Sequence, residues 1–348
     1  MQFPMARRHG SDAYPAMMPM LLTFAGAARR AGAGGLLLAG MLAAPAALAQ
    51  DASQWLTRVA NAARTLNYTG TIVYQLGGRM ETSRIVHLNE SGQEWEKLVS
   101  LDGAPREIIR GGGEVRYYFP ESKVMRVEPR TFRNAFPSLS PDQIKSLAQY
   151  YDFRVITGER IAGHAADVVA FEPKDGLRYG HKFWSDSTTG LLLKARLVNE
   201  RGEVVEQFAF TDLNVNAKID RDMVKPSWSA AAPEWQVRQS ATGEVVQHDT
   251  GWTISKLPPG FVKINEGYRT LHGKREPVAH IVLSDGLVAV SVFIEPMAVT
   301  QTQIGLTQQG ALNVFSTRNE AYVVTVLGEA PPATVRQIAH SVGRRATP

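Results

Sequence analysis

The feature that most constrains the fold of this chain is a series of period-two segments joined by very short connections. Six such segments occupy residues 69–76, 82–88, 94–101, 107–110, 115–119 and 123–128. Turn-forming residues separate them, for example Gly77 and Gly78 or the glycine run 111–113. A parallel pair would need a crossover of a dozen or more residues, for which these connections leave no room. The pattern therefore predicts consecutive strands that pair antiparallel.

A second group of predicted strands follows at residues 153–157, 166–172, 182–185, 191–199 and 204–212. In the segment 191–199, Leu193, Ala195 and Leu197 share one face, while Lys194 and Arg196 share the other. Strands this long and this consecutive predict one large, strongly curved antiparallel sheet.

The segment before the first strand predicts an amphipathic helix. Asp51 is a suitable N-cap, and apolar residues follow at helical spacing: Trp55, Val59, Ala62, Ala63 and Leu66. Full burial of each large member would contribute roughly 1.5–3 kcal/mol, so we expect this helix to pack on the sheet.

Residues 1–49 have the layout of a secretory signal peptide. Arg29 and Arg30 precede the uncharged run 31–44, and Ala47-Leu48-Ala49 forms a small-x-small site that predicts cleavage near Ala49–Gln50. The run is shorter than the roughly 20 residues that a membrane-spanning helix needs, although an anchor stays open as an alternative. We therefore expect export to the periplasm. The true start could also be a later methionine, among Met17, Met18 and Met20.

The chain contains no cysteine. An exported protein without cysteine has no disulfide framework and no lipid attached to a cysteine, so its core must hold the fold. The four arginines and one aspartate of residues 1–49 leave the mature chain with 34 basic and 32 acidic residues. A net charge of about +2 argues against a nucleic-acid-binding protein, which needs a clustered basic face.

Composition changes after residue 216, where Pro226 and the run 230–233 are typical of a linker. Predicted strands then return at residues 278–283, 287–295, 312–317 and 321–327. A last helix, introduced by Pro331 and Pro332, has the buried stripe Val335, Ile338, Ala339 and Val342. We predict a signal peptide at 1–49, a large domain at 50–216, a linker at 217–250 and a small α+β domain at 251–348.

A search for catalytic residues returns very little. The histidines are scattered, no serine lies in a G-x-S-x-G turn, and the glycine run 111–113 lacks the lysine of a phosphate loop. Glu94 and Glu96 share a strand face, which we interpret as solvated rather than as a glycosidase pair. His181, near Trp184 and Asp186, is interpreted as structural. We predict no enzyme, no metal and no cofactor; an exported hydrolase would need histidine and carboxylate groups that meet in a cleft.

Aromatic side chains on the predicted strands are the more informative group. They either fill a core or line a cleft that holds an acyl chain, and the candidates are Trp95, Tyr117, Phe119, Phe183, Phe208 and Phe210. Residues 131–141 contain two prolines and lead into a short predicted helix at 142–150. This segment is either a loop packed over one end of the sheet or a flap over an apolar groove, with Phe132, Phe136 and Leu139 as its candidates.

Four segments carry a specific resemblance: residues 150–213, WTISKLPPGF at 252–261, SDGLVAVSVFIEP at 284–296 and NEAYVVTVLGEAPPATVRQIAHSV at 319–342. They resemble the periplasmic RseB/MucB family over essentially the whole mature chain. The resemblance implies a large domain like the lipoprotein carriers LolA and LolB, an incomplete antiparallel barrel with helices in its concave side. A linker would join it to the small domain.

The resemblance also implies a function. Such proteins bind the periplasmic part of a membrane-spanning anti-sigma factor (RseA or MucA), shield it from the site-1 protease and so restrain an extracytoplasmic sigma factor. Lipid or lipopolysaccharide releases them, and a homodimer is implied. The expected docking surfaces are the small domain and the groove between the domains. The main alternative is a periplasmic lipid or lipoprotein carrier, which has no use for a second domain.

Overall fold

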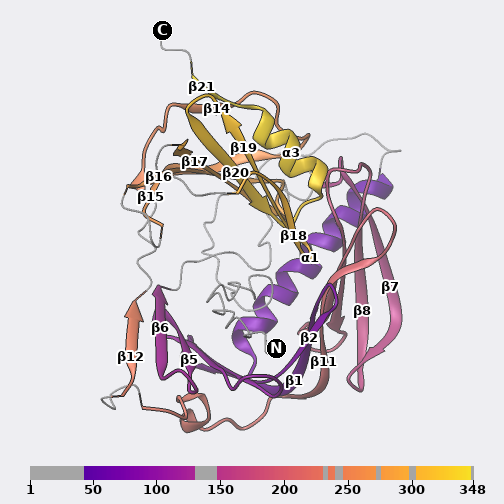
Figure 1. Ribbon diagram of the computed structural model, residues 1–348. Coiled ribbons are helices and arrows are strands. Elements are labelled where there is room, and N and C mark those ends of the chain that lie inside the picture. The colour runs from indigo at the N-terminus through magenta and orange to yellow at the C-terminus, as the bar shows by residue number, and fades with distance from the viewer. Residues whose placement is uncertain are drawn as a thin grey trace, which may run out of the picture.

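The computed structural model describes residues 43–129, 147–229, 234–239, 246–271, 276–297 and 303–345. Its main elements are a 12-stranded sheet and a 7-stranded sheet, here the large and the small sheet. The small sheet lies over one end of the large one (Figure 1). The predicted fold class, a large curved antiparallel sheet followed by a smaller C-terminal α+β unit, is confirmed.

The large sheet consists of β1 (Tyr68–Leu76), β2 (Arg79–Glu90), β3 (Gln93–Ser100), β4 (Glu107–Gly111), β5 (Glu114–Phe119), β6 (Val124–Pro129), β7 (Tyr151–Ile161), β8 (His164–Pro173), β9 (Gly180–Asp186), β10 (Leu192–Val198), β11 (Val204–Val215) and β12 (Gln236–Gln239). Their order is β12-β6-β5-β4-β3-β2-β1-β11-β10-β9-β8-β7. The end strands β12 and β7 are not paired with each other, so the sheet is curved but open.

Within β1 to β6 and within β7 to β11, consecutive strands pair antiparallel, as the short connections require. The two groups of strands found in the sequence meet where β1 pairs with β11, with Tyr74 opposite Phe208. One bulge interrupts this ladder, between Thr71 and Ile72. Such a bulge bends its strand and strengthens the local twist.

Helix α1 (Ala43–Thr65) lies in the hollow of the large sheet (Figure 1). It begins eight residues before the predicted N-cap, so Asp51 lies inside the helix. The alanine-rich segment before Asp51 explains the extension, because alanine has the highest helix propensity. Side chains on one face of α1 are buried against the strands, among them Trp55, Leu56, Val59, Ala62 and Ala63.

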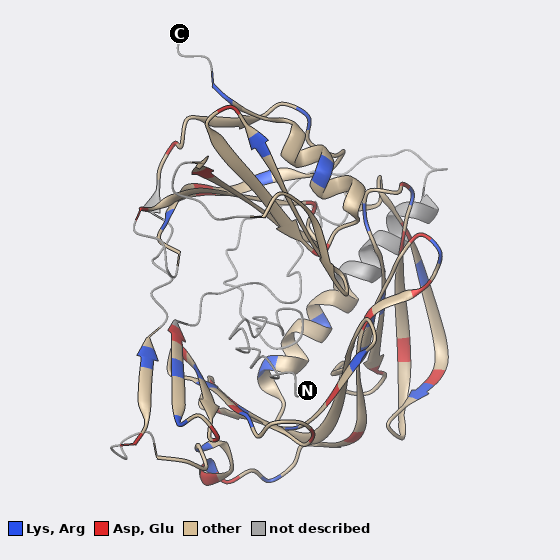
Figure 2. Ribbon diagram, viewed as in Figure 1, with Lys and Arg blue, Asp and Glu red and all other residues tan. Residues whose placement is uncertain are grey.

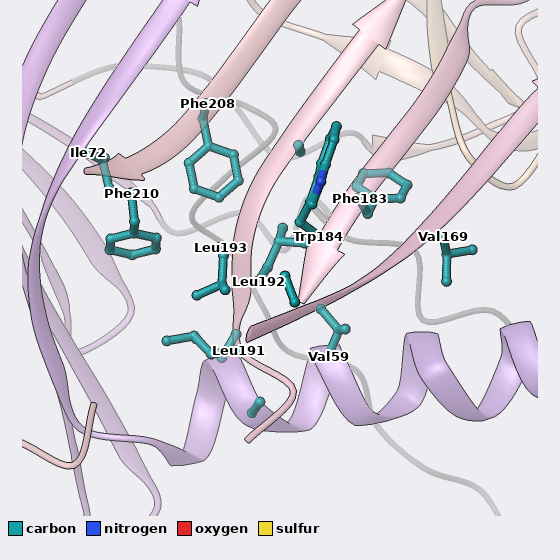
Figure 3. Close-up of a cluster of buried hydrophobic side chains, with 14 of the residues drawn as sticks. Val59, Ile72, Val169, Phe183, Trp184, Leu191, Leu192, Leu193, Phe208 and Phe210 are labelled. Carbon is teal, nitrogen blue, oxygen red and sulfur yellow. The ribbon is translucent and has the colours of Figure 1, made fainter. Parts of the chain in front are cut away.

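The core of the large sheet forms between α1 and the concave face. Figure 3 shows Val59 on the side of α1 that faces Leu191, Leu193 and Phe183. Trp55 packs against Phe183 with ring centroids 6.2 Å apart, and its Nε1 donates a hydrogen bond to Ser185 Oγ at 2.8 Å. The helix is therefore fixed by both apolar burial and one buried polar contact.

The small sheet has the order β13-β15-β16-β17-β20-β19-β18. Its strands are β13 (Val246–Gln247), β15 (Val262–Arg269), β16 (Val278–Ser284), β17 (Ala289–Pro296), β18 (Gly305–Gln309), β19 (Leu312–Asn319) and β20 (Tyr322–Gly328). Helix α3 (Pro332–His340) covers one face and buries Val335, Ile338 and Ala339 there. The short strands β14 (Trp252–Ile254) and β21 (Val342–Arg344) form a separate pair.

The segment between the two sheets packs in several places on the large one. A short 3-10 helix, η1 (Arg221–Val224), buries Val224 against Val86 and Leu88. β12 then adds to β6 as a parallel strand, and Trp235 packs edge-on to Tyr118 with centroids 5.8 Å apart. The parallel pair is possible because a long connection precedes β12. The domain boundaries given above stay a prediction.

Charged residues are distributed evenly over the described chain. Figure 2 shows Lys and Arg interspersed with Asp and Glu along both sheets. In the described residues, no helix has the length and apolarity needed to cross a membrane.

Candidate functional site

Three of the predicted cleft residues come together on the concave face. Phe183, Phe208 and Phe210 belong to the core beneath α1, each no more than 5% exposed. Phe208 and Phe210 have ring centroids 6.1 Å apart, and Phe183 contacts Phe171 at 5.8 Å. In the form described, these rings are packed against neighbouring side chains (Figure 3). An acyl chain that enters here must displace some of them.

The other three cleft candidates are separated from this core to different degrees. Tyr117 is half-buried at its margin, where burial and the nearby Glu128 raise the pKa of its hydroxyl. Phe119 is half-buried at the end of β5 and does not belong to that cluster. Trp95 packs beside Val86, Leu88 and Val224, with the Arg221 guanidinium 4.0 Å from its ring. The predicted flap residues Phe132, Phe136 and Leu139 lie outside the described residues.

A buried ion pair occupies the other part of the concave face. Glu96 is 6% exposed and pairs with Arg110, which corrects the interpretation of its strand face as solvated. The pair is formed because β3 and β4 place the two side chains directly opposite each other. A lone buried carboxylate would be very unfavourable, whereas one paired with arginine is tolerated.

His87 lies opposite Glu96 across β2 and β3, so a histidine and a carboxylate do meet on this face. Both groups already have partners. His87 Nδ1 is 2.9 Å from the Leu66 carbonyl oxygen, and the ring stacks on Tyr68 at 4.9 Å. Glu96 binds Arg110. A general base needs a group that is free to take a proton from substrate, and this arrangement is typical of a structural network.

His181 lies in the apolar core, away from Asp186. Neither of its ring nitrogens has a hydrogen-bond partner within the described part of the chain. Burial lowers its pKa from 6.5 to about 4, so the ring is neutral near pH 7. Asp186 instead pairs with His164 at 3.1 Å. The residues His181 and Asp186 therefore do not form a catalytic pair.

The two sheets are joined by a second buried ion pair. Arg178, in the β8–β9 loop, donates from Nη1 to Asp285 Oδ2 at 3.0 Å, and both side chains are fully buried. Arg178 Nη2 also donates to the Pro259 carbonyl oxygen at 2.5 Å. Tyr151 Oη donates to the same Asp285 oxygen at 3.1 Å. We call these four residues, Arg178, Asp285, Tyr151 and Pro259, the sheet joint.

Aromatic rings enclose the sheet joint. The Arg178 guanidinium lies 4.8 Å from the Tyr150 ring centroid and 5.5 Å from those of Tyr151 and Phe261. The rings exclude water and offer their negatively polarised faces to the cation. The low local dielectric strengthens the attraction between Arg178 and Asp285, and it raises the cost of losing either partner.

Three further contacts between the two sheets lie beside the sheet joint. Asn313 Nδ2 donates to Tyr179 Oη at 2.9 Å, and Thr334 Oγ1 donates to the Leu177 carbonyl oxygen at 2.5 Å. Ala311 of the small sheet is buried against Tyr179 and Leu197 of the large one. The β8–β9 loop is therefore the part of the large sheet that holds the small sheet in place.

Sequence reasoning missed the sheet joint. Arg178 and Asp285 lie beside similar Asp-Gly-Leu turns, at 175–177 and 285–287. In each turn the aspartate accepts a backbone hydrogen bond from the leucine at 3.0 Å. The turns are readable as local structure. Nothing in a single sequence indicates that two loops 107 positions apart pair with each other.

A polar hollow lies beside β15 of the small sheet. It has a volume of about 620 Å³ and is lined by His248, Asp249, Lys263, Ile264, Asn265, Glu266 and Arg345. Its cations are already neutralised, because Lys263 pairs with Glu266 and Arg345 pairs with Asp249. The arrangement is a polar hollow and differs in chemistry from the apolar concave face.

Comparison with known proteins gives a consistent result. Residues 51–228 match the MucB/RseB N-terminal domain family, and residues 246–343 match the MucB/RseB C-terminal domain family. The sigma factor AlgU regulatory protein MucB of Pseudomonas aeruginosa is 35% identical over 312 residues, which are 88% of this chain and 95% of that protein. The sigma-E factor regulatory protein RseB of Escherichia coli is 28% identical over 282 residues, 81% of this chain and 87% of that protein.

Solved structures agree with these relatives. A crystal structure of MucB in complex with MucA(peri) has a TM-score of 0.65 and 34% identity, and covers 85% of this chain and 100% of that one. A crystal structure of MucB has a TM-score of 0.57 and 32% identity, over 85% and 98% of the two chains. Since both family regions occur here and the similarity extends over nearly the whole of these relatives, the chain belongs to the MucB/RseB family.

Proposed function

We propose that this chain is an exported regulator that works by binding rather than by catalysis. It would bind the periplasmic region of an RseA/MucA-like anti-sigma factor, shield it from site-1 proteolysis and so restrain an extracytoplasmic sigma factor. The observation that carries the proposal is the similarity to MucB, which has been crystallised with MucA(peri). The relatives are sigma factor regulatory proteins by name.

The proposed location of this activity is the periplasm. The layout of residues 1–49 supports export, after which the mature chain would begin at Gln50. We also propose that residues 50–216 and 251–348 act as two domains, connected by 217–250, and that the mature protein forms a homodimer. The separate apolar cores beneath α1 and beneath α3 support the division into domains.

The releasing signal is proposed to be a lipid or lipopolysaccharide. The apolar concave face supports this, because an acyl chain that displaces some of the packed rings Phe183, Phe208 and Phe210 would enter an apolar environment. Release would follow from linkage: a ligand that prefers the partner-free form lowers partner affinity by its differential binding energy. A tenfold loss of affinity needs a difference of only about 1.4 kcal/mol.

Calorimetric titration of the mature protein with the periplasmic segment of the cognate anti-sigma factor tests the proposal. We expect saturable binding that weakens at least tenfold when lipopolysaccharide is present, and no binding of a segment with scrambled sequence. Binding of lipid without any binding of the segment would contradict the regulator and favour the lipid carrier instead.

A further inference from the structure

We propose that Tyr151 is a positioning residue that links the packing of the large-sheet core to the position of the small sheet. Entry of an acyl chain into the core would thereby loosen the sheet joint, and with it the surface that holds the partner. The entry of an acyl chain and the loss of the partner rest on the proposed function. The link between core and joint is a property of the free protein.

Tyr151 is part of both the large-sheet core and the sheet joint. Its ring is 1% exposed and packs edge-on to Phe171 at 6.4 Å and to His181 at 6.3 Å, inside the large-sheet core. Its hydroxyl reaches the small sheet, where it donates to Asp285 Oδ2 at 3.1 Å. Burial and the adjacent Asp285 raise the pKa of this hydroxyl well above its usual value, so it remains a proton donor.

Asp285 in turn organises the turn between β16 and β17. Its Oδ1 accepts the backbone N–H groups of Leu287 at 3.0 Å and Val288 at 2.9 Å, while Oδ2 accepts Tyr151 and Arg178. One fully buried carboxylate thus holds both the turn and the joint. If a donor is lost, the charge is less well satisfied, and the turn can open more often.

The core on the other side of Tyr151 leaves little room for movement. Phe171 is fully buried and contacts Tyr151, Phe153 and Phe183 at centroid distances between 5.1 and 6.4 Å. Interiors this densely packed transmit a displacement to the next side chain rather than absorb it. An acyl chain that displaces Phe171 would therefore shift the Tyr151 ring and lengthen its bond to Asp285.

The chain supplies a matched control for Tyr151. Tyr74 is also a buried tyrosine of the same core, and its hydroxyl donates to the carboxylate Glu206 at 2.7 Å. Both residues of that pair lie in the large sheet, on β1 and β11. Loss of the Tyr74 hydroxyl removes the same kind of bond, and that bond involves neither Asp285 nor the β16–β17 turn.

Hydrogen exchange of the mature protein, read at the β16–β17 turn, tests the link. Exchange by local opening reports the opening equilibrium of that turn directly. A bond to a charged group is worth roughly a factor of ten or more. We therefore expect Tyr151→Phe to accelerate exchange at residues 285–288 roughly tenfold, with less than a twofold change for Tyr74→Phe. The β19–β20 turn serves as an internal reference for general destabilisation.

A core substitution tests the direction of the link. Phe171→Leu should also accelerate exchange at residues 285–288, whereas Phe210→Leu, in the same core but packed on Tyr68 and Phe208, should not. In the Tyr151→Phe background, Phe171→Leu should add nothing at this turn, because the connecting bond is already absent. Unchanged exchange in Tyr151→Phe, or fully additive effects in the double variant, would overturn the proposal.

The result of the exchange experiment can be separated from the result of the binding test for the proposed function. Exchange is measured without partner or lipid, so failure of the anti-sigma segment to bind leaves the exchange result as the test of Tyr151. If the segment binds the wild-type protein, Tyr151→Phe should retain lipid binding yet show a smaller lipid-induced loss of segment affinity. An undiminished loss in that variant would contradict the link.

Discussion

At the scale of single residues, the fully buried pair Arg178 and Asp285 carries a large desolvation cost at the contact between the two sheets. Both side chains are fully buried and have lost their contacts with water. Each charge is therefore stabilised mainly by the opposite charge of its partner. Arg178 has one further carboxylate, Asp175, at 3.0 Å, and that group is partly exposed. The position of the small sheet therefore depends on a few atoms.

Replacement of Asp285 should be strongly destabilising. Asp285→Ala leaves the buried guanidinium without its buried partner and is expected to lower the free energy of unfolding by about 3–5 kcal/mol. Urea unfolding of the mature protein measures this change. The control is Glu172→Ala, which breaks the exposed pair with Arg154 and should cost no more than about 1 kcal/mol. Equal losses of unfolding free energy in the two variants would show that Arg178 does not depend on Asp285 for its stabilisation.

His181 should make the protein sensitive to mild acid. Its folded-state pKa is lowered to about 4 from 6.5, so between these values the unfolded chain binds a proton that the folded protein excludes. The contribution of His181 to the free energy of unfolding is thus fully present above about pH 6.5. It falls by about 3 kcal/mol as the pH decreases to 4. His181→Leu should remove this part of the pH dependence in urea unfolding, and exposed His248→Gln should not. A slope unchanged by His181→Leu would contradict a neutral buried ring.

Some of the site residues can be predicted from the sequence, and others cannot. The period-two pattern of a strand places Phe208 and Phe210, two residues apart on β11, on one face, and the tertiary structure brings Phe183 into the same core. The pattern did not distinguish Trp95, whose neighbours include Val224 from a distant segment. The local sequence indicates a solvated Glu96, because its partner, Arg110, is supplied by the pairing of two strands.

At the scale of elements, α1 is the piece that fills the hollow of the large sheet. Leu56→Ala, at a position 1% exposed, should lower the free energy of unfolding by about 2–5 kcal/mol, because it removes buried methyl groups and leaves a cavity. Gln54→Ala on the exposed side of the helix should change it by no more than about 0.5 kcal/mol. Circular dichroism during thermal unfolding gives both values. Similar small effects at the two positions would mean that α1 does not pack as described.

Elements with a regular pattern were predictable, and irregular ones were not. Long alternating strands such as β1 and β11 follow directly from sequence, and so does α3 after Pro331 and Pro332. β12 has four exposed residues and β15 has an irregular burial pattern, so neither produces a readable period. Helix α1 starts earlier than predicted, because the alanine-rich sequence before Asp51 extends the helix toward the N-terminus.

At the scale of the whole molecule, the two sheets come close together at Gly310. Its φ of +57° lies in the left-handed region, and a Cβ atom there would overlap the Leu76 side chain of the large sheet. Gly310→Ala should therefore cost backbone strain of about 1 kcal/mol and a further 1–3 kcal/mol from the overlap. Gly92→Ala, with φ +82° and open space around it, should show the strain alone. Equal losses of unfolding free energy would place the β18–β19 turn away from Leu76.

The relative placement of the two sheets was not predictable from sequence, since it depends on contacts between loops that are far apart in the chain. The linker composition only indicated that two units exist. Their attachment arises from the pairing of Arg178 with Asp285 and of Asn313 with Tyr179. Each of these residues is unremarkable in its local sequence and acquires its role through the tertiary structure.

We propose that this chain protects an anti-sigma factor until a lipid signal arrives. The most direct measurement follows cleavage of the periplasmic segment of the cognate anti-sigma factor by its site-1 protease, with and without the mature protein, and then with lipopolysaccharide. We predict that the protein slows cleavage and that lipopolysaccharide restores it. Cleavage at the same rate with and without the protein would contradict the claim.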